Sequence, residues 1–153
     1  VLYERLVDGL QLNSHRLLFP KQVTLSPAEH LTVLEHRDLL HEFGMEIEDF
    51  GGQTVLVRTL PEALDEADIR GILSDAADEL RSGERPGKST REAVAARIAC
   101  HGSVRGTRVL SREGLNALLS DLENCRDPRH CPHGRPTTVE MSIDDLKKLF
   151  KRK

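Results

Sequence analysis

The chain has 153 residues, enough for one domain or two small subdomains that bury about two-thirds of the unfolded surface. Apolar residues make up 38% and charged residues 31% of the sequence, a balance that excludes disordered and membrane-spanning classes. The net charge of −3 argues against strong binding of nucleic acid by these residues alone. The three cysteines lack disulfide-type spacing, so we expect a reducing, cytoplasmic location without membrane contact.

The first part of the sequence predicts a helix, a strand and a second helix. Residues 1–12 carry leucines at steps of four and predict an amphipathic helix; because the chain begins inside it and without Met, we expect a fragment. Residues 16–25 are short and apolar with Pro20 in the middle, which predicts an edge or interrupted strand. Residues 26–44 predict the clearest helix, capped by Ser26 and stopped by the glycine at its end.

The second part predicts one hairpin, several helices and a last strand. Residues 45–61 predict two strands around a Gly-Gly turn. The remaining expected elements are an acidic helix or helix pair (62–83), an alanine-rich helix (89–106), a helix with leucines on one face (111–125), a strand (137–141) and a capped helix (142–153). This mixture predicts an α+β fold.

A cluster of cysteine and histidine residues follows the helix expected at 111–125. Cys131 and His133 lie two residues apart, so on an extended backbone their side chains point to the same side. Zn²⁺ prefers thiolate and imidazole but needs about four ligands, and Cys125, His130 and Cys100 are the other candidates. Two alternatives remain open: the cysteines are small buried apolar residues, or one is a catalytic nucleophile, which no orienting Asn or Asp supports.

Three motifs resemble one protein family in their order and spacing. They are ACHGSVR (99–105), CPHGRP (131–136) and LFKR (149–152), with FGG and VLVR between residues 50 and 58. CPHGRP is the most specific of them. Together they resemble the C-terminal endonuclease domain of the MutL family of DNA mismatch repair proteins, along the whole chain.

This resemblance implies a divalent-metal endonuclease that nicks the daughter strand during mismatch repair, in a bacterial cytoplasm at the nucleoid. It implies that Cys100, Cys131 and His133 are ligands of Zn²⁺, while Mn²⁺ or Mg²⁺ serves nicking. The family's acidic ligands lie on a helix with the consensus DQHAxxExxxxE, and VLYE matches only its end, so Glu4 takes the place of the last Glu. Since the rest of that motif is absent from these residues, we expect the chain alone to be inactive.

Two arginines are further candidates for the site. Arg135, within CPHGRP, is expected to contact phosphate because a planar guanidinium matches phosphate oxygens; a salt bridge is the alternative. The resemblance points Arg152 toward the site and gives Phe150 a packing role. It gives no role to Cys125 or His130, which we expect in a surface loop.

The segment HRLLFP (15–20) is similar to the family's sliding-clamp-binding motif, QxxLxP. His15 stands where the motif has Gln, whereas Leu18 and Pro20 match it. Such a segment docks by inserting apolar side chains into a groove of its partner. The alternative is a plain buried strand, and exposure of Leu18 and Phe19 distinguishes the two.

The resemblance also implies two subdomains. Residues 1–15 and 89–153 would form a dimerisation and catalytic part, and residues 16–88 an inserted external part. The expected partners are a second copy in a homodimer, the sliding clamp, other mismatch repair proteins and, weakly, DNA. Two functions are predicted: a metal-dependent nicking endonuclease, or a non-catalytic dimerisation and clamp-docking module with a structural zinc site.

Overall fold

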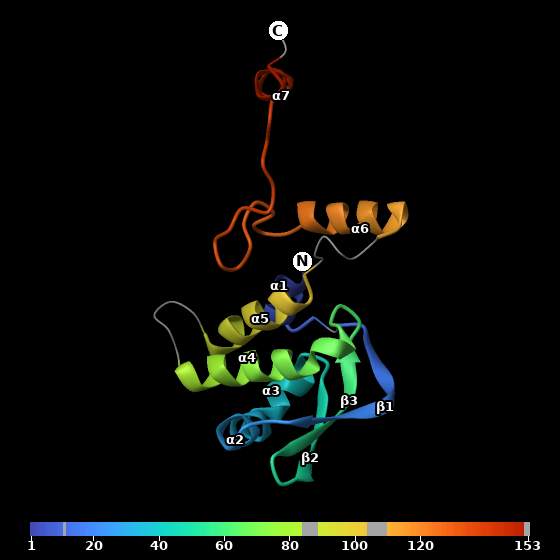
Figure 1. Ribbon diagram of the computed structural model, residues 1–153, viewed down its shortest axis with the longest axis vertical. Helices are drawn as coiled ribbons and strands as arrows, with labels where there is room; N and C mark the ends of the chain where they lie inside the picture. The colour runs from blue at the N-terminus through green and yellow to red at the C-terminus, as the bar shows by residue number, and fades with distance from the viewer. Residues whose placement is uncertain (11, 84–88, 104–109, 152–153) are drawn as a thin grey trace. The chain divides into compact units, whose positions relative to one another are not determined.

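The computed structural model describes residues 1–10, 12–83, 89–103 and 110–151. They belong to two compact units, Val1–Ser111 and Arg112–Lys153 (Figure 1). The first unit combines helices with a small sheet, and the second consists of two helices and the long loop between them. No helix within the described ranges is both long and apolar enough to cross a membrane.

The first unit is built around a three-stranded antiparallel sheet. Its elements are α1 (Leu2–Val7), β1 (Ser14–Thr24), α2 (Pro27–Glu35), α3 (Arg37–Glu42), β2 (Glu46–Gly51), β3 (Thr54–Pro61), a short 3₁₀ helix (Glu66–Asp68), α4 (Ile69–Ser82) and α5 (Thr90–His101). The strand order β1-β3-β2 places β3 in the middle and makes β1 the edge strand that the sequence predicted. The α+β fold class is confirmed.

The central strand, β3, contributes buried side chains to the hydrophobic core. Val55 and Val57 on β3 are fully buried, whereas the residues between and beside them are partly exposed, the alternation expected of a strand with one buried face. Gly51 and Gly52 turn from β2 into β3 with φ values of 92° and 63°, a backbone region that glycine reaches without steric cost. The predicted hairpin is therefore confirmed (Figure 1).

The helix predicted for residues 26–44 is interrupted. Its start is as expected, because Ser26 caps α2 and forms a reciprocal capping box with Glu29. The backbone leaves helical geometry at His36, with φ −110° and ψ 20°, and α3 begins at the next residue. Thr32 donates its hydroxyl to the Ala28 carbonyl, a bond that bends helices, and the His36 ring contacts the Thr32 carbonyl at 3.0 Å. Side-chain competition for backbone carbonyls thus accompanies the break.

Helices α4 and α5 complete the core of the first unit. Helix α4 packs against α2 and α5, and α5 packs against α1 (Figure 1). Their fully buried apolar side chains include Ile72, Leu73, Ala76, Ala77, Val94, Ala95 and Ile98. The acidic and alanine-rich helices predicted from the sequence are both present but shorter than expected: α4 begins at Ile69 after the short 3₁₀ helix, and α5 ends at His101. Residues 104–106 of the second prediction lie outside the described residues.

The second unit contains α6 (Arg112–Glu123) and α7 (Ile143–Leu149), as predicted. Ser142 caps α7 by accepting the Asp145 N–H at 3.1 Å. The strand predicted for residues 137–141 is wrong: those residues join no ladder, and the described part of this unit shows only an isolated bridge between His130 and Pro136. A strand exists only where a neighbour pairs with its backbone, and composition cannot supply that neighbour.

The division into a terminal part (1–15 and 89–153) and an inserted part (16–88) stays a prediction. Its second boundary adjoins residues 84–88, which lie outside the described residues, as do Gln11 and the segment 104–109.

Glu29 links the start of α2 to α4 and should make stability depend on pH. Its carboxylate accepts the Ser74 hydroxyl and, at 2.7 Å, the Ser26 N–H; these bonds, Ser74 first, lower its pKa to about 2. Because the folded pKa lies below the unfolded value, this stabilisation is complete above pH ~4.5 and is lost as pH falls toward about 2. We expect Glu29→Gln to lower the free energy of unfolding by about 1 kcal/mol at pH 7, because solvent screens part of the interaction. At pH 2 the change should be almost nothing.

Urea unfolding between pH 7 and pH 2 measures this difference. Glu35→Gln, at an exposed position on the same helix, serves as the control and should follow the wild type at every pH. A cost for Glu29→Gln that is the same at pH 7 and pH 2 would contradict the assignment.

Candidate functional site

The CPHGRP segment forms a tight turn held by its own backbone. Cys131 donates its N–H to the Arg135 carbonyl at 2.8 Å, and Gly134 donates to the Cys131 carbonyl at 2.8 Å. The Arg135 N–H points at the Cys131 sulfur, with a distance of 3.4 Å. Gly134 has φ 79°, so the turn needs glycine at this position.

This turn presents a sulfur and an imidazole two residues apart. An N–H directed at sulfur stabilises negative charge there, and thiolate is the form in which cysteine binds metals. Cys131 is partly exposed and His133 is exposed, so both side chains reach the surface of the turn. The donor set of this turn therefore fits a soft or borderline cation such as Zn²⁺.

The residues around the turn brace it. Thr137 donates its N–H to the Arg129 carbonyl at 2.8 Å, closing the loop outside the CPHGRP segment. The His130 ring contacts the Asp127 carboxylate at 3.2 Å, and Cys125 is half-buried in the loop that follows α6. Both residues thus lie in the loop region where we expected them. The Arg135 side chain is exposed, and Arg152 lies outside the described residues.

The third predicted ligand lies in the other unit. Cys100 occupies the last turn of α5 and is exposed. Glu4 lies on α1, the helix that packs beside α5, so the fold brings the helices bearing these two candidates together (Figure 1). The convergence of Cys100 with Cys131 and His133 stays a prediction. Within either unit, as far as its residues are described, no three His, Cys, Asp or Glu side chains gather as a ready metal site.

The HRLLFP segment bulges out of the sheet edge. Pairing of β1 with β3 is regular up to Arg16 and resumes at Lys21, with a register shift between them. Leu17 points inward and is 4% exposed, whereas Leu18 is 87% and Phe19 is 77% exposed. The exposure that distinguishes a docking segment from a buried strand is therefore confirmed, and docking itself stays a prediction.

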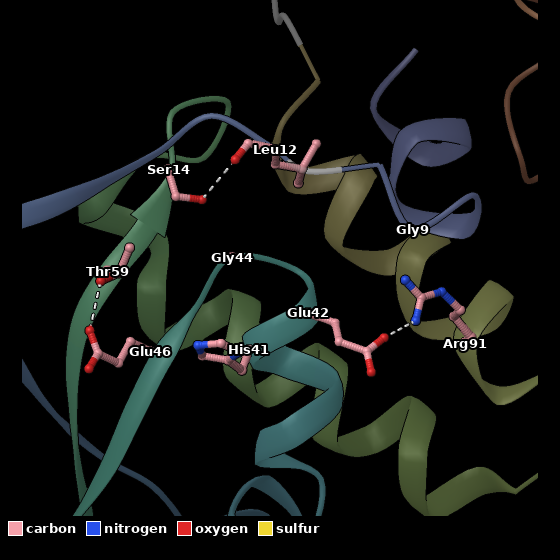
Figure 2. Close-up of a pocket in the computed structure, with 9 residues that line it drawn as sticks. All are labelled: Gly9, Leu12, Ser14, His41, Glu42, Gly44, Glu46, Thr59 and Arg91. Atoms are coloured by element: carbon pink, nitrogen blue, oxygen red, sulfur yellow. Dashed lines mark hydrogen bonds and ion pairs between the residues drawn. The ribbon is translucent and has the colours of Figure 1, made fainter.

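A polar hollow lies elsewhere in the first unit. It has a volume of about 710 Å³ and is lined by Gly9, Leu12, Ser14, His41, Glu42, Gly44, Glu46, Thr59 and Arg91 (Figure 2). Arg91 donates to the Leu6 carbonyl at 2.9 Å and to the Glu42 carboxylate, and it lies 5.0 Å from the centre of the Phe43 ring. The guanidinium thus ties α1, α3 and α5 together. No predicted site residue lines this hollow, so we assign it no chemistry.

Comparison with known proteins decides the family. A family model described as the MutL C terminal dimerisation domain matches residues 1–110. The chain belongs to the MutL family. The chain is 35% identical over 154 residues to the DNA mismatch repair protein MutL of Thermodesulfovibrio yellowstonii. The alignment covers 99% of the chain and 28% of that protein. The corresponding proteins of Bartonella quintana and Rhodopseudomonas palustris are each 39% identical over 158 residues, covering the whole chain and 26% and 27% of their own lengths.

The chain thus spans about a quarter of the length of these MutL relatives. The resemblance inferred from the three motifs is confirmed. Membership places the chain in the C-terminal dimerisation domain of MutL proteins, and the relatives that it matches are DNA mismatch repair proteins. The activity, metals and partners of the complete protein are proposals.

The chain also contains charged groups that the sequence motifs did not indicate. Asp68, Asp75 and Glu79 precede or lie along α4, and Arg97 and His101 lie on the facing side of α5. Glu79 is buried, with its side chain 4% exposed, and accepts from Arg97 Nε at 2.9 Å; this hydrogen bond raises the pKa of Arg97. The sequence signal for these pairs was the spacing of the charges. The three acidic residues lie seven and four positions apart, and the two basic residues lie four apart, so each set falls on one helix face.

Proposed function

We propose that this chain is the dimerising, metal-binding part of a DNA-nicking endonuclease that acts in mismatch repair. The observation that carries the proposal is the CPHGRP turn, whose backbone directs an N–H at the Cys131 sulfur beside His133. The shared family of the chain and the neighbourhood of α1 and α5 support it. The direct test is nicking of supercoiled plasmid in Mn²⁺ or Mg²⁺ by the natural protein that carries these residues, together with its zinc content.

In this proposal each candidate residue has one task. Cys100, Cys131 and His133 hold Zn²⁺, and Glu4 adds a carboxylate to the metal site. A bound divalent cation supplies Lewis acidity toward a phosphodiester. Arg135 and Arg152 bind phosphate oxygens and orient the DNA backbone, since the planar guanidinium donates two parallel hydrogen bonds.

The second candidate is a non-catalytic module that dimerises and docks on a sliding clamp, with zinc in a structural role. The exposed pair Leu18 and Phe19 favours the docking part of this alternative. The two candidates separate in one assay, because only the first nicks DNA when Mn²⁺ or Mg²⁺ is supplied. In both, a homodimer is the working form, and sedimentation equilibrium measures it.

Docking on the clamp makes a specific prediction for Leu18. We expect Leu18→Ala to weaken clamp binding by about 10-fold, because an exposed leucine that fills a partner's groove acts as an anchor. The same change should leave the free energy of unfolding within about 0.5 kcal/mol of wild type, since the side chain is 87% exposed in the free chain. Surface plasmon resonance on immobilised clamp and urea unfolding measure the two effects.

Leu31→Ala is the matched control for this prediction. Leu31 is 59% exposed on α2, outside the HRLLFP segment, and its replacement should leave clamp binding unchanged. Equal clamp affinity of the Leu18→Ala and wild-type proteins would show that the bulge has another role.

A further inference from the structure

The ring of His101 is held from both sides at the end of α5. Nδ1 lies 2.5 Å from Asp68 Oδ2, and Nε2 lies 3.1 Å from Asp75 Oδ2. Because each ring nitrogen faces a different carboxylate, rotation of the ring would break both contacts. The His101 side chain is only 13% exposed, so these contacts are largely buried and differ from a surface ion pair.

A glycine on α4 leaves room for the His101 ring and the Asp68 carboxylate. Gly71 lies on α4 between the two aspartates, and a Cβ there would come within 2.5 Å of Asp68 Oδ1 and 3.5 Å of His101 Cε1. Gly102, directly after His101, packs equally closely: a Cβ there would come within 2.5 Å of Leu2 on α1 and 3.2 Å of the Ala63 carbonyl. The end of α5 is therefore anchored to α4 through His101 and to α1 through Gly102.

The contacts of His101 and Gly102 restrict the helix end that carries Cys100. The last turn of a helix frays unless side chains or caps hold it, and a metal ligand must stay within about 0.5 Å of its productive position. Cys100 is the residue before His101 and is exposed, so its own side chain gains little from the core. Its carbonyl accepts the Ser103 hydroxyl at 2.8 Å, which closes the turn but does not tie it to α4.

We infer that His101 is a positioning residue: held by Asp68 and Asp75, it fixes the last turn of α5 and thereby the sulfur of Cys100. The inference rests on the proposed role of Cys100 as a zinc ligand. His101 lies beside the ligand in the ACHG motif, and the two aspartates come from the 3₁₀ helix before α4 and from α4 itself. His101 itself is not a ligand in this arrangement, because both ring nitrogens already face carboxylates.

The test compares variants of the natural protein that carries these residues. His101→Phe keeps an aromatic ring and removes both contacts, and Asp75→Asn keeps the shape and weakens one. We expect His101→Phe to lower zinc affinity about 10-fold, and Asp75→Asn by a smaller factor, in competition with a chromophoric chelator. Amide hydrogen exchange at residues 100–103 should be about 10-fold faster in His101→Phe, which reports the freed helix end without any metal.

His30→Phe is the matched control, because His30 also faces one aspartate, Asp49 at 3.2 Å, and is 14% exposed, but lies on α2. Unchanged zinc affinity in His30→Phe together with the expected losses in the His101 and Asp75 variants supports the inference. Wild-type zinc affinity in His101→Phe, while Cys100→Ser loses zinc, overturns the positioning role and leaves the proposed function intact. Wild-type affinity in Cys100→Ser overturns the proposed zinc site itself. An equal loss in His30→Phe overturns the inference as a general effect on stability.

Discussion

Replacing Cys131 with Ser is expected to lower metal-dependent nicking by the natural protein about 100-fold and to remove bound zinc. A serine hydroxyl is a poor ligand for a borderline-soft cation, and it ionises far less readily than a thiol. The same substitution removes the sulfur at which the Arg135 N–H points, so the turn also loses one of its internal contacts. Plasmid nicking in Mn²⁺ and zinc analysis by mass spectrometry measure the two losses together.

The third cysteine offers a matched control. Cys125 lies six residues before Cys131, in the loop after α6, and is half-buried, with its sulfur directed at the Asp121 carbonyl at 3.4 Å. Cys125→Ser should nick DNA and bind zinc as the wild type does. If Cys131→Ser also retained full nicking and full zinc content, the metal role of the CPHGRP turn would be wrong. Loss of zinc with unchanged nicking would instead favour the non-catalytic module with structural zinc.

The second large effect is expected at the junction of α4 and α5. Arg97→Met should lower the free energy of unfolding by about 2–3 kcal/mol, because it leaves the buried Glu79 carboxylate without this ion pair. The loss stays below the full range for deeply buried pairs, since the Arg97 side chain is 44% exposed and water reaches its guanidinium. Urea unfolding at pH 7 measures it.

Two further variants identify the cause. Arg81→Met removes a surface pair on α4, where Arg81 Nη1 lies 3.9 Å from Asp78, and should change stability by less than about 0.5 kcal/mol. Combining Glu79→Leu with Arg97→Met should recover most of the loss, because the buried charge is then gone as well. Similar losses in Arg97→Met and Arg81→Met, or no recovery in the double variant, would show that burial of Glu79 is not the reason.

These charged groups also explain how α4 and α5 are held in register. Apolar contacts between α4 and the alanine-rich α5 tolerate sliding, since one small apolar side chain resembles another. Arg97 with Glu79, and His101 with Asp68 and Asp75, are satisfied in one alignment only. The register that they set fixes where the last turn of α5, and therefore Cys100, lies within its unit.

The HRLLFP segment shows what the sequence predicts and what only the structure decides. The motif HRLLFP singled out Leu18 and Pro20, and proline in a strand already predicted an edge position. Three consecutive apolar residues, however, give no indication of which side chain faces the core. The irregular pairing between β1 and β3 decides this: it directs Leu17 inward and leaves Leu18 and Phe19 exposed.

The amino-acid sequence by itself determined the features that depend on neighbouring residues. The caps at Ser26 and Ser142, the glycine turn of the hairpin and the family motifs are all local, because each rests on hydrogen bonds or backbone preferences within a few positions. The tertiary structure alone decided what requires a distant partner. No edge among the described residues pairs with residues 137–141, so no strand forms there. His101 lies between two carboxylates only because the fold brings Asp68, just before α4, and Asp75, on α4, to its ring. The spacing of these charged residues marks one face of each helix, but it does not show that the two faces meet, since the energy that selects the contact comes from packing between segments far apart in sequence.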